Sequence, residues 1–86
     1  MEFILNGNIM TDRGATHDHL AEQLELPAYY GRNLDALYDV LMELSGEIVL
    51  QDPAAVTGHL GRYGEALLAT MQEAAENNPH LSFTLK

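Results

Sequence analysis

The sequence predicts a small α/β domain in which a three-stranded parallel sheet is packed by about four helices. Short apolar segments near the start, middle and end of the chain are typical of strands, and two helical segments separate each strand from the next. Helical crossovers of this length favour parallel pairing. With 86 residues and no linker, repeat or low-complexity segment, residues 1–86 are expected to form one domain.

Three short segments are the predicted strands. Glu2–Asn6 (EFILN) is apolar, and Asn6-Gly7 supplies a turn after it. Glu47–Leu50 (EIVL) is apolar enough to lie inside the sheet. Leu81–Leu85 (LSFTL) alternates between apolar and polar residues, as a half-buried strand does.

The first crossover contains two predicted helices. Thr16–Glu25 ends at Leu26-Pro27, because the residue before a proline is disfavoured in the α region. Asn33 is a suitable N-cap for the second helix, which Ser45-Gly46 ends. At 100° per residue, this helix has an apolar face of Leu34, Leu37, Leu41 and Leu44. The opposite, solvent-facing side carries Asp35, Asp39, Met42 and Glu43.

The second crossover also contains two predicted helices. Asp52-Pro53 is typical of an N-cap followed by proline at the first helical position, and the short helix runs to about Leu60. Glu65–Glu76 is a stronger helix that Asn77-Asn78-Pro79 ends.

The charge of the chain excludes one class of partner. It has 13 acidic and 4 basic residues, a formal net charge of −9, so it is not expected to grip the phosphates of a nucleic acid. Such a chain can instead attract a basic protein. The acids are concentrated, since positions 33–61 contain no Lys or Arg but include Asp35, Asp39, Glu43, Glu47 and Asp52.

Several absences favour a soluble cytoplasmic protein. The start, MEFILNGNIM, lacks the basic and apolar regions of a signal peptide, and no run approaches the ~18 apolar residues of a membrane span. The chain has no cysteine, which fits a reducing compartment and excludes disulfides and Cys-type zinc sites.

The segment LPAYYGRNLDALYDVL places Tyr29, Tyr30 and Tyr38 beside two aspartates one helical turn apart. Tyrosine next to acid is a composition suited to a basic protein surface, because the ring gives a large contact area at low entropic cost. Alternatively, one or two of these rings belong to the core; Tyr38 is expected at its boundary.

A hydrolase or metal site is a weaker interpretation of Asp35 and Asp39. No histidine or third carboxylate stands at ligand spacing beside them, and no HExxH or DxDxDG pattern occurs. His17 and His19 are two residues apart and would point in different directions on a helix. They are expected to be surface or hydrogen-bonded histidines.

This segment, with ILNG and the closing strand, resembles the barstar family of intracellular inhibitors of the secreted ribonuclease barnase. The family motif is close to LPxYYGxNLDALWD, and Tyr38 replaces its tryptophan. The resemblance covers the whole chain. It implies a barstar-like fold and an inhibitor that performs no catalysis and needs no cofactor or metal.

The resemblance also implies roles for individual residues. Asp39 would occupy the nuclease's phosphate site with Asp35 beside it, and Tyr29 would lie against the catalytic histidine. Glu73 on the last helix would add an ion pair. The full set of expected partner-binding residues is Tyr29, Tyr30, Gly31, Asn33, Leu34, Asp35, Tyr38, Asp39, Met42, Glu43 and Glu73.

Four residues depart from the family's pattern. Arg32 stands where the family often has an acid, and it could pair with Asp35 or repel a basic nuclease. Met42 and Glu43 replace smaller residues, and Leu44 stands where an aromatic residue is common. These departures indicate a different nuclease or an altered contact surface.

The resulting hypothesis is a cytoplasmic protein, monomeric when free, that inhibits a secreted microbial guanyl-preferring ribonuclease as a 1:1 complex. One alternative keeps the fold but gives it another basic partner, such as a toxin without ribonuclease activity. An acyl carrier protein is a further alternative, since NLDALYDVL partly matches the DSLDxxxLV segment of that class. That chemistry needs a serine where this chain has Asn33.

Overall fold

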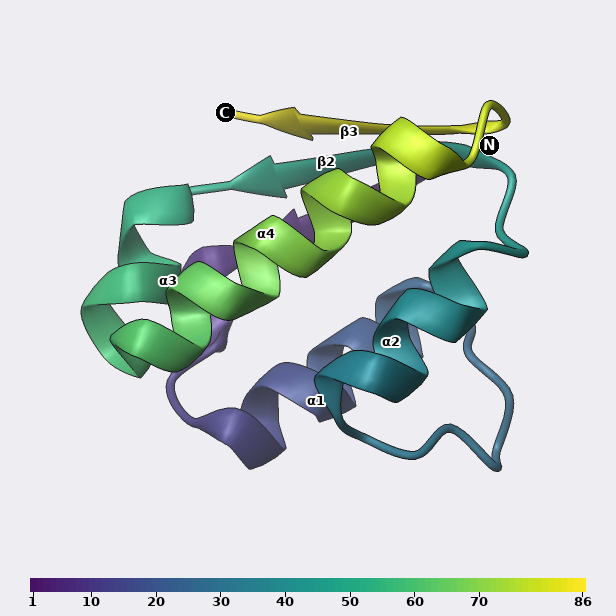
Figure 1. Ribbon diagram of the computed structural model, residues 1–86. Coiled ribbons are helices and arrows are strands. Elements are labelled where there is room, and N and C mark those ends of the chain that lie inside the picture. The colour runs from purple at the N-terminus through teal and green to yellow at the C-terminus, as the bar shows by residue number, and fades with distance from the viewer.

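The computed structural model describes residues 1–86 and shows one sheet with its helices on one side (Figure 1). The strands are β1 (Glu2–Asn6), β2 (Gly46–Gln51) and β3 (Leu81–Leu85). The helices are α1 (Arg13–Gln23), α2 (Leu34–Leu41), α3 (Pro53–Leu60) and α4 (Arg62–Asn77), with a 3₁₀ turn, η1 (Gly7–Ile9), after β1. The predicted fold class is therefore confirmed.

The sheet is parallel throughout and has the order β1-β2-β3. The segment predicted to lie inside the sheet is its central strand. In register, Phe3 lies beside Ile48, which lies beside Phe83. Because side chains alternate between the two faces of a strand, this row faces the helices together with Leu5 and Leu50.

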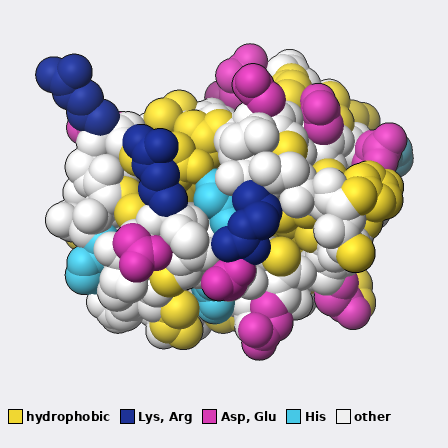
Figure 2. Space-filling model, turned by 90° about the horizontal axis from the view of Figure 1, so that it is seen from below, with side chains coloured by type: hydrophobic (Ala, Val, Ile, Leu, Met, Phe, Trp, Pro, Cys, Tyr) yellow, Lys and Arg dark blue, Asp and Glu magenta, His cyan; other side chains and the backbone are white.

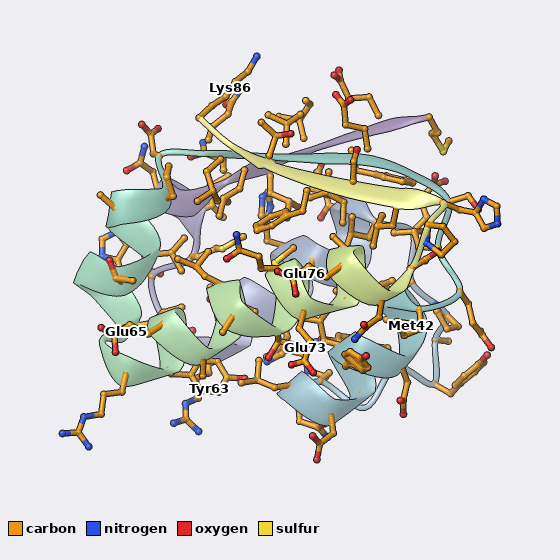
Figure 3. All side chains as sticks on the ribbon, turned by 45° about the horizontal axis from the view of Figure 1, so that its top comes forward. Met42, Tyr63, Glu65, Glu73, Glu76 and Lys86 are labelled. Atoms are coloured by element: carbon orange, nitrogen blue, oxygen red, sulfur yellow. The ribbon has the colours of Figure 1, made fainter.

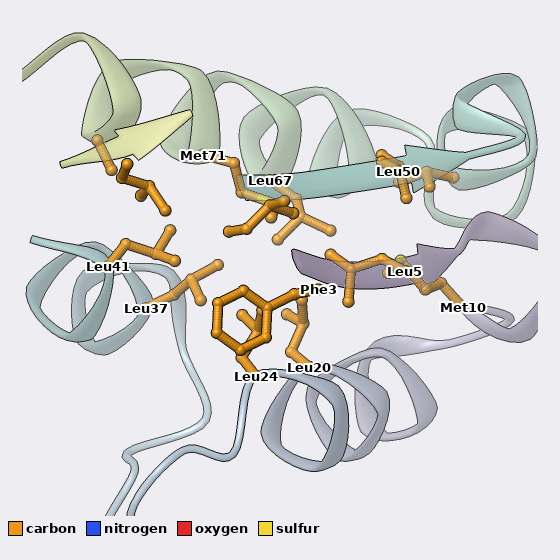
Figure 4. Packing of buried hydrophobic residues seen from close by; sticks show 14 of the residues in the cluster. Phe3, Leu5, Met10, Leu20, Leu24, Leu37, Leu41, Leu50, Leu67 and Met71 are labelled. Atoms are coloured by element: carbon orange, nitrogen blue, oxygen red, sulfur yellow. The ribbon is translucent and has the colours of Figure 1, made fainter. Parts of the chain in front are cut away.

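The core lies between the sheet and the helices. Figure 4 shows the Phe3 ring among Leu20 of α1, Leu24 just after that helix, and Leu37 of α2. This packing joins the first crossover to the sheet. The buried cluster consists of Phe3, Leu5, Met10, Leu20, Leu24, Tyr30, Leu37, Leu41, Ile48, Leu50, Val56, Leu67, Met71, Ala74 and Leu81.

Helix α1 begins three residues earlier than predicted. The side chain of Asp12 accepts a hydrogen bond of 2.7 Å from the backbone N–H of Ala15, so Asp12 is the N-cap. The predicted end holds to within two residues, since the helix ends at Gln23.

Asp52 is the N-cap residue of α3 and Pro53 follows at the start of the helix, as predicted, but the Asp52 side chain makes no capping hydrogen bond. Asp52 has left-handed backbone angles, and its carboxylate accepts a 2.8 Å hydrogen bond from the Asn8 amide. Helix α3 does begin at Pro53 and end at Leu60. Helix α4 begins at Arg62, earlier than expected, because Gly61 reverses the chain at a positive φ of 58°.

Helix α2 has the predicted N-cap but ends earlier than predicted. The Asn33 side chain accepts from the backbone N–H of Ala36 at 2.8 Å. The helix ends at Leu41, and the buried Asn78 amide donates to the carbonyls of Leu41 and Leu44 at 2.9 and 2.8 Å. Asn78 thus satisfies carbonyl groups that the helix end leaves unpaired.

No helix of the structure combines the length and apolar character that crossing a membrane requires.

Replacing Asn78 with alanine is expected to lower the free energy of unfolding by about 2 kcal/mol, because a buried and a part-buried carbonyl each lose a hydrogen bond. Urea denaturation measures this change. The matched control is Asn77→Ala, which removes one exposed hydrogen bond to the Tyr38 hydroxyl and should cost less than about 1 kcal/mol. Equal losses in the two variants would contradict the anchoring role of Asn78.

Candidate functional site

Three carboxylates from two helices meet at one groove between α2 and α4. We call it the acidic groove; its volume is about 390 Å³. Figure 3 shows Glu73 on the part of α4 that lies next to α2. The groove is lined by Leu34, Asp35, Tyr38, Asp39, Thr70 and Glu73.

The leucine face of α2 determines where these carboxylates point. Leu37 and Leu41 are fully buried, whereas Asp35 and Asp39 are exposed on the other side of the helix. The predicted two faces of this helix are confirmed for these residues. Asp35 lies in the first turn, near the positive end of the helix dipole, which favours a negative charge there.

None of the three groove carboxylates has a basic partner within the chain. The single ion pair of the structure joins Arg32 to Asp18 at 2.6 Å. The expected possibility that Arg32 pairs with Asp35 is therefore wrong. The acidic groove presents its charges to solvent and to whatever binds there.

Tyr38 and Thr70 form the rest of the groove wall. Tyr38 is half-buried, as predicted, and its hydroxyl accepts a 2.8 Å hydrogen bond from the Asn77 amide of α4. Thr70 was missed from the sequence. Its position three residues before Glu73 on one helix is the signal that could have found it.

The two adjacent tyrosines have opposite environments. Tyr29 is 85% exposed and, with Glu43, lines a separate hollow of about 330 Å³. Tyr30 is only 7% exposed and belongs to the core, so its expected place on the contact surface is corrected. Met42 follows the last turn of α2 and is half-buried, since part of its side chain packs against the core, so its predicted solvent-facing position is met only in part.

Tyr30 is held by a buried hydrogen-bonded chain. Its hydroxyl lies 2.7 Å from Nδ1 of His17, and the hydroxyl of Tyr63 lies 2.6 Å from Nε2 of the same ring. A neutral imidazole donates through one nitrogen and accepts through the other, so both contacts are hydrogen bonds. These two hydrogen bonds attach the loop that carries Tyr29 and Tyr30 to His17 of α1 and, through it, to Tyr63 of α4.

Both histidines of α1, His17 and His19, are buried and hydrogen-bonded. Burial lowers the pKa of His17, and the nearby Arg32 and Arg13 lower it further. His19 accepts from the backbone N–H of Asn6 at 2.9 Å, and burial lowers its pKa. Burial also raises the pKa of Tyr30 above its ordinary value. The predicted hydrogen-bonded role of the histidines is confirmed.

The loop before α2 is held in one conformation. Arg32 has a left-handed φ of 57°, and its guanidinium donates to the Gly14 carbonyl at 3.2 Å besides pairing with Asp18. Gly31 lies so close to α2 that a Cβ there would be 3.1 Å from the Ala36 Cβ. Gly31 and Asn33 are exposed at this loop, as a contact role requires.

The structure contains no group of three or more His, Asp or Glu side chains placed to hold a metal ion. That no cofactor is needed remains a prediction.

A family model described as "Barstar (barnase inhibitor)" matches residues 1–86. The chain belongs to the barstar family. It is also 37% identical over 78 residues to a protein of Bacillus subtilis (strain 168) named "Putative ribonuclease inhibitor YrdF". That alignment covers 87% of this chain and 86% of the relative.

The barstar family resemblance predicted from the sequence is thus confirmed over the whole chain. Its motif had placed Asp35 and Asp39 on one surface and, by alignment of the last helix, had added Glu73. The structure brings these three residues to the acidic groove.

Stability is expected to fall as the pH drops from 7.5 to 5.5. The folded-state pKa values of His17 and His19 lie below the ordinary value of 6.5, so the unfolded chain binds more protons in this range. Their contribution is fully present above 6.5 and is lost as the pH falls towards the folded-state pKa values. Urea denaturation at a series of pH values measures it.

Two variants test whether the buried histidines of α1 cause this pH dependence of stability. His17→Gln should reduce the pH dependence, because it removes one of the two groups with a lowered pKa, and the double variant His17→Gln/His19→Gln should reduce it further. A parent protein whose stability is constant between pH 7.5 and 5.5 would contradict the lowered pKa values.

Proposed function

We propose that this barstar-family protein inhibits a secreted microbial guanyl-preferring ribonuclease by covering its active site, and that it is not itself an enzyme. The observation that supports this most directly is the acidic groove. Its three carboxylates, Asp35, Asp39 and Glu73, lack any basic partner in the chain.

The proposed mechanism is imitation of the substrate's phosphate. A ribonuclease that cleaves a phosphodiester gathers positive charge around the scissile group. In the proposed complex the Asp39 carboxylate takes the place of that phosphate among the nuclease's arginines and histidine. Asp35, one turn earlier, and Glu73, across the groove, provide further ion pairs.

The tyrosine loop extends the proposed contact surface. Tyr29 is the most exposed aromatic ring and would lie against the catalytic histidine. An exposed tyrosine offers a large contact area with few rotatable bonds, which keeps the entropic cost of binding low. Gly31, Asn33 and Leu34 would form the rim, and Glu43 beside Tyr29 would contact the partner's edge.

Preformed charge favours such a complex on physical grounds. The three carboxylates lie on α2 and α4, and the packing of these helices against the core fixes their backbone. Little backbone ordering is therefore needed when the partner binds. The complex is proposed to be 1:1, with a free inhibitor that is monomeric and cytoplasmic.

A different basic protein, such as a toxin without ribonuclease activity, is the second candidate partner. The same groove would serve it, and an assay of ribonuclease activity separates the two candidates. An acyl carrier role is less well supported, because the Asn33 side chain is occupied as the N-cap of α2.

The proposed function is tested by titrating the purified chain into a panel of secreted microbial ribonucleases that includes barnase. Loss of RNA cleavage at a 1:1 ratio is expected for at least one member. For that member, Asp39→Ala should weaken binding by at least about 30-fold and Asp35→Ala by about tenfold. These ranges derive partly from the barnase–barstar complex itself, so they are family expectations.

The matched control is Glu47→Ala, which removes one exposed carboxylate from β2, outside the groove. It should leave the Kd within about twofold of the parent. If Asp39→Ala bound as tightly as Glu47→Ala, the phosphate-mimic mechanism would be wrong.

Association should slow as salt rises. Attraction between the acidic groove and a basic active site accelerates encounter, and dissolved ions screen it. The association rate constant from stopped-flow mixing is expected to fall roughly tenfold or more between 50 mM and 500 mM NaCl. An association rate independent of salt would rule out electrostatic steering.

A further inference from the structure

Beside the acidic groove lies a second hollow of the opposite charge, which we call the arginine hollow. Its volume is about 220 Å³, and Arg13, Arg32, His17 and Tyr63 contribute to its lining. Leu34 lines both hollows, so the two are neighbours. Figure 2, which views the helical side, shows a histidine flanked by Lys or Arg side chains.

Both arginines are held in place. The guanidinium carbon of Arg13 lies 4.0 Å from the centroid of the Tyr63 ring, and the Tyr63 hydroxyl is fixed by His17. Arg32 is held by Asp18 and by the Gly14 carbonyl. A guanidinium has five N–H donors, and stacking on a ring uses none of them, so each arginine keeps donors for a ligand.

The arginine hollow is positively charged, although the chain as a whole is strongly negative. The protein has only four Lys and Arg residues in a net charge of −9, and two of the four line this hollow. Asp18 forms an ion pair with Arg32 but not with Arg13, and 70% of the Asp18 side chain is exposed. His17 adds no charge near neutral pH, because burial and the two arginines lower its pKa.

We propose that the arginine hollow binds the carboxylate of an Asp or Glu side chain on the partner nuclease, next to that enzyme's active site, and so selects among basic nucleases. This inference rests on the proposed function. Planar guanidinium groups match a carboxylate in a two-bond geometry. A nucleic-acid strand is disfavoured, because the adjacent Asp35, Asp39 and Glu73 repel its phosphates.

Long-range and local electrostatics predict opposite results, which makes the proposal testable. Towards a basic partner, every arginine on the inhibitor is unfavourable at long range, so removing one should leave binding unchanged or strengthen it. Loss of Arg13 or Arg32 weakens binding if the partner has a local acid there, or if the arginine supports the loop before α2; a double-mutant cycle separates these two causes.

The experiment compares the Kd of Arg13→Ala, Arg32→Ala and Arg62→Ala against the ribonucleases of the panel that bind the parent. Arg62 is an exposed matched control at the start of α4 and does not line the hollow. Arg13→Ala and Arg32→Ala should each weaken binding about fivefold or more, and Arg62→Ala should not. The same change in all three variants would overturn the proposal.

A double-mutant cycle separates direct contact from support of the loop. Each acidic residue of the bound nuclease is changed to alanine and tested against the parent, Arg13→Ala and Arg32→Ala. One acid is expected to couple to Arg32 by about fivefold or more. If no acid couples to either arginine, these residues only position the loop and the proposal fails.

A further measurement does not depend on the nuclease. The free protein is titrated with sodium acetate, and with sodium chloride at equal ionic strength, while backbone amide NMR shifts are followed. Saturable acetate-specific shifts at Gly14 and Arg32 are expected in the parent and in Asp39→Ala, but not in the Arg13→Ala/Arg32→Ala double variant. Their absence in the parent would overturn carboxylate binding, whereas a panel in which no ribonuclease is inhibited would overturn only the proposed function.

Discussion

The leucine face of α2 packs on the core beside α4, and this packing fixes the position of every carboxylate in the acidic groove. Leu37 and Leu41 are fully buried, so the helix cannot rotate without exposing them. Asn78 then holds the end of α2 through two carbonyl groups. With the helix fixed at its core face and at its end, Asp35 and Asp39 point to the same side as Glu73 of α4.

The same arrangement opposes stability in the free protein. Like charges one helical turn apart repel each other, and the acidic groove supplies no cation to relieve them. The fold tolerates this because the carboxylates are exposed to water, where repulsion is screened, while the buried polar groups are satisfied. Every buried side-chain nitrogen and oxygen has a hydrogen-bond partner. The structure thus combines buried polar side chains that are all hydrogen-bonded with three groove carboxylates that have no basic partner.

Local sequence patterns predicted most of the fold and part of the site. The leucine spacing and the Asn33 cap lie within a few residues of one another, so the faces of α2 could be predicted without any tertiary information. The early end of α2 could not, because the amide that satisfies it comes from Asn78, more than thirty residues away. Likewise, nothing local distinguishes Tyr29 from Tyr30. The buried ring is the one whose hydroxyl bonds to His17, and only the folded chain brings His17 to Tyr30.

Arg32 shows why net charge is an insufficient description of this surface. Counted as one of four bases, it only reduces the attraction for a basic partner. In the fold it bonds to Asp18 and Gly14 of α1, which draws the loop against that helix and sets a positive hollow beside the acidic groove. Leu34 separates the two charges. A surface with a positive site and a negative site side by side discriminates by the arrangement of the partner's charges, because a partner that is uniformly basic satisfies only one of them.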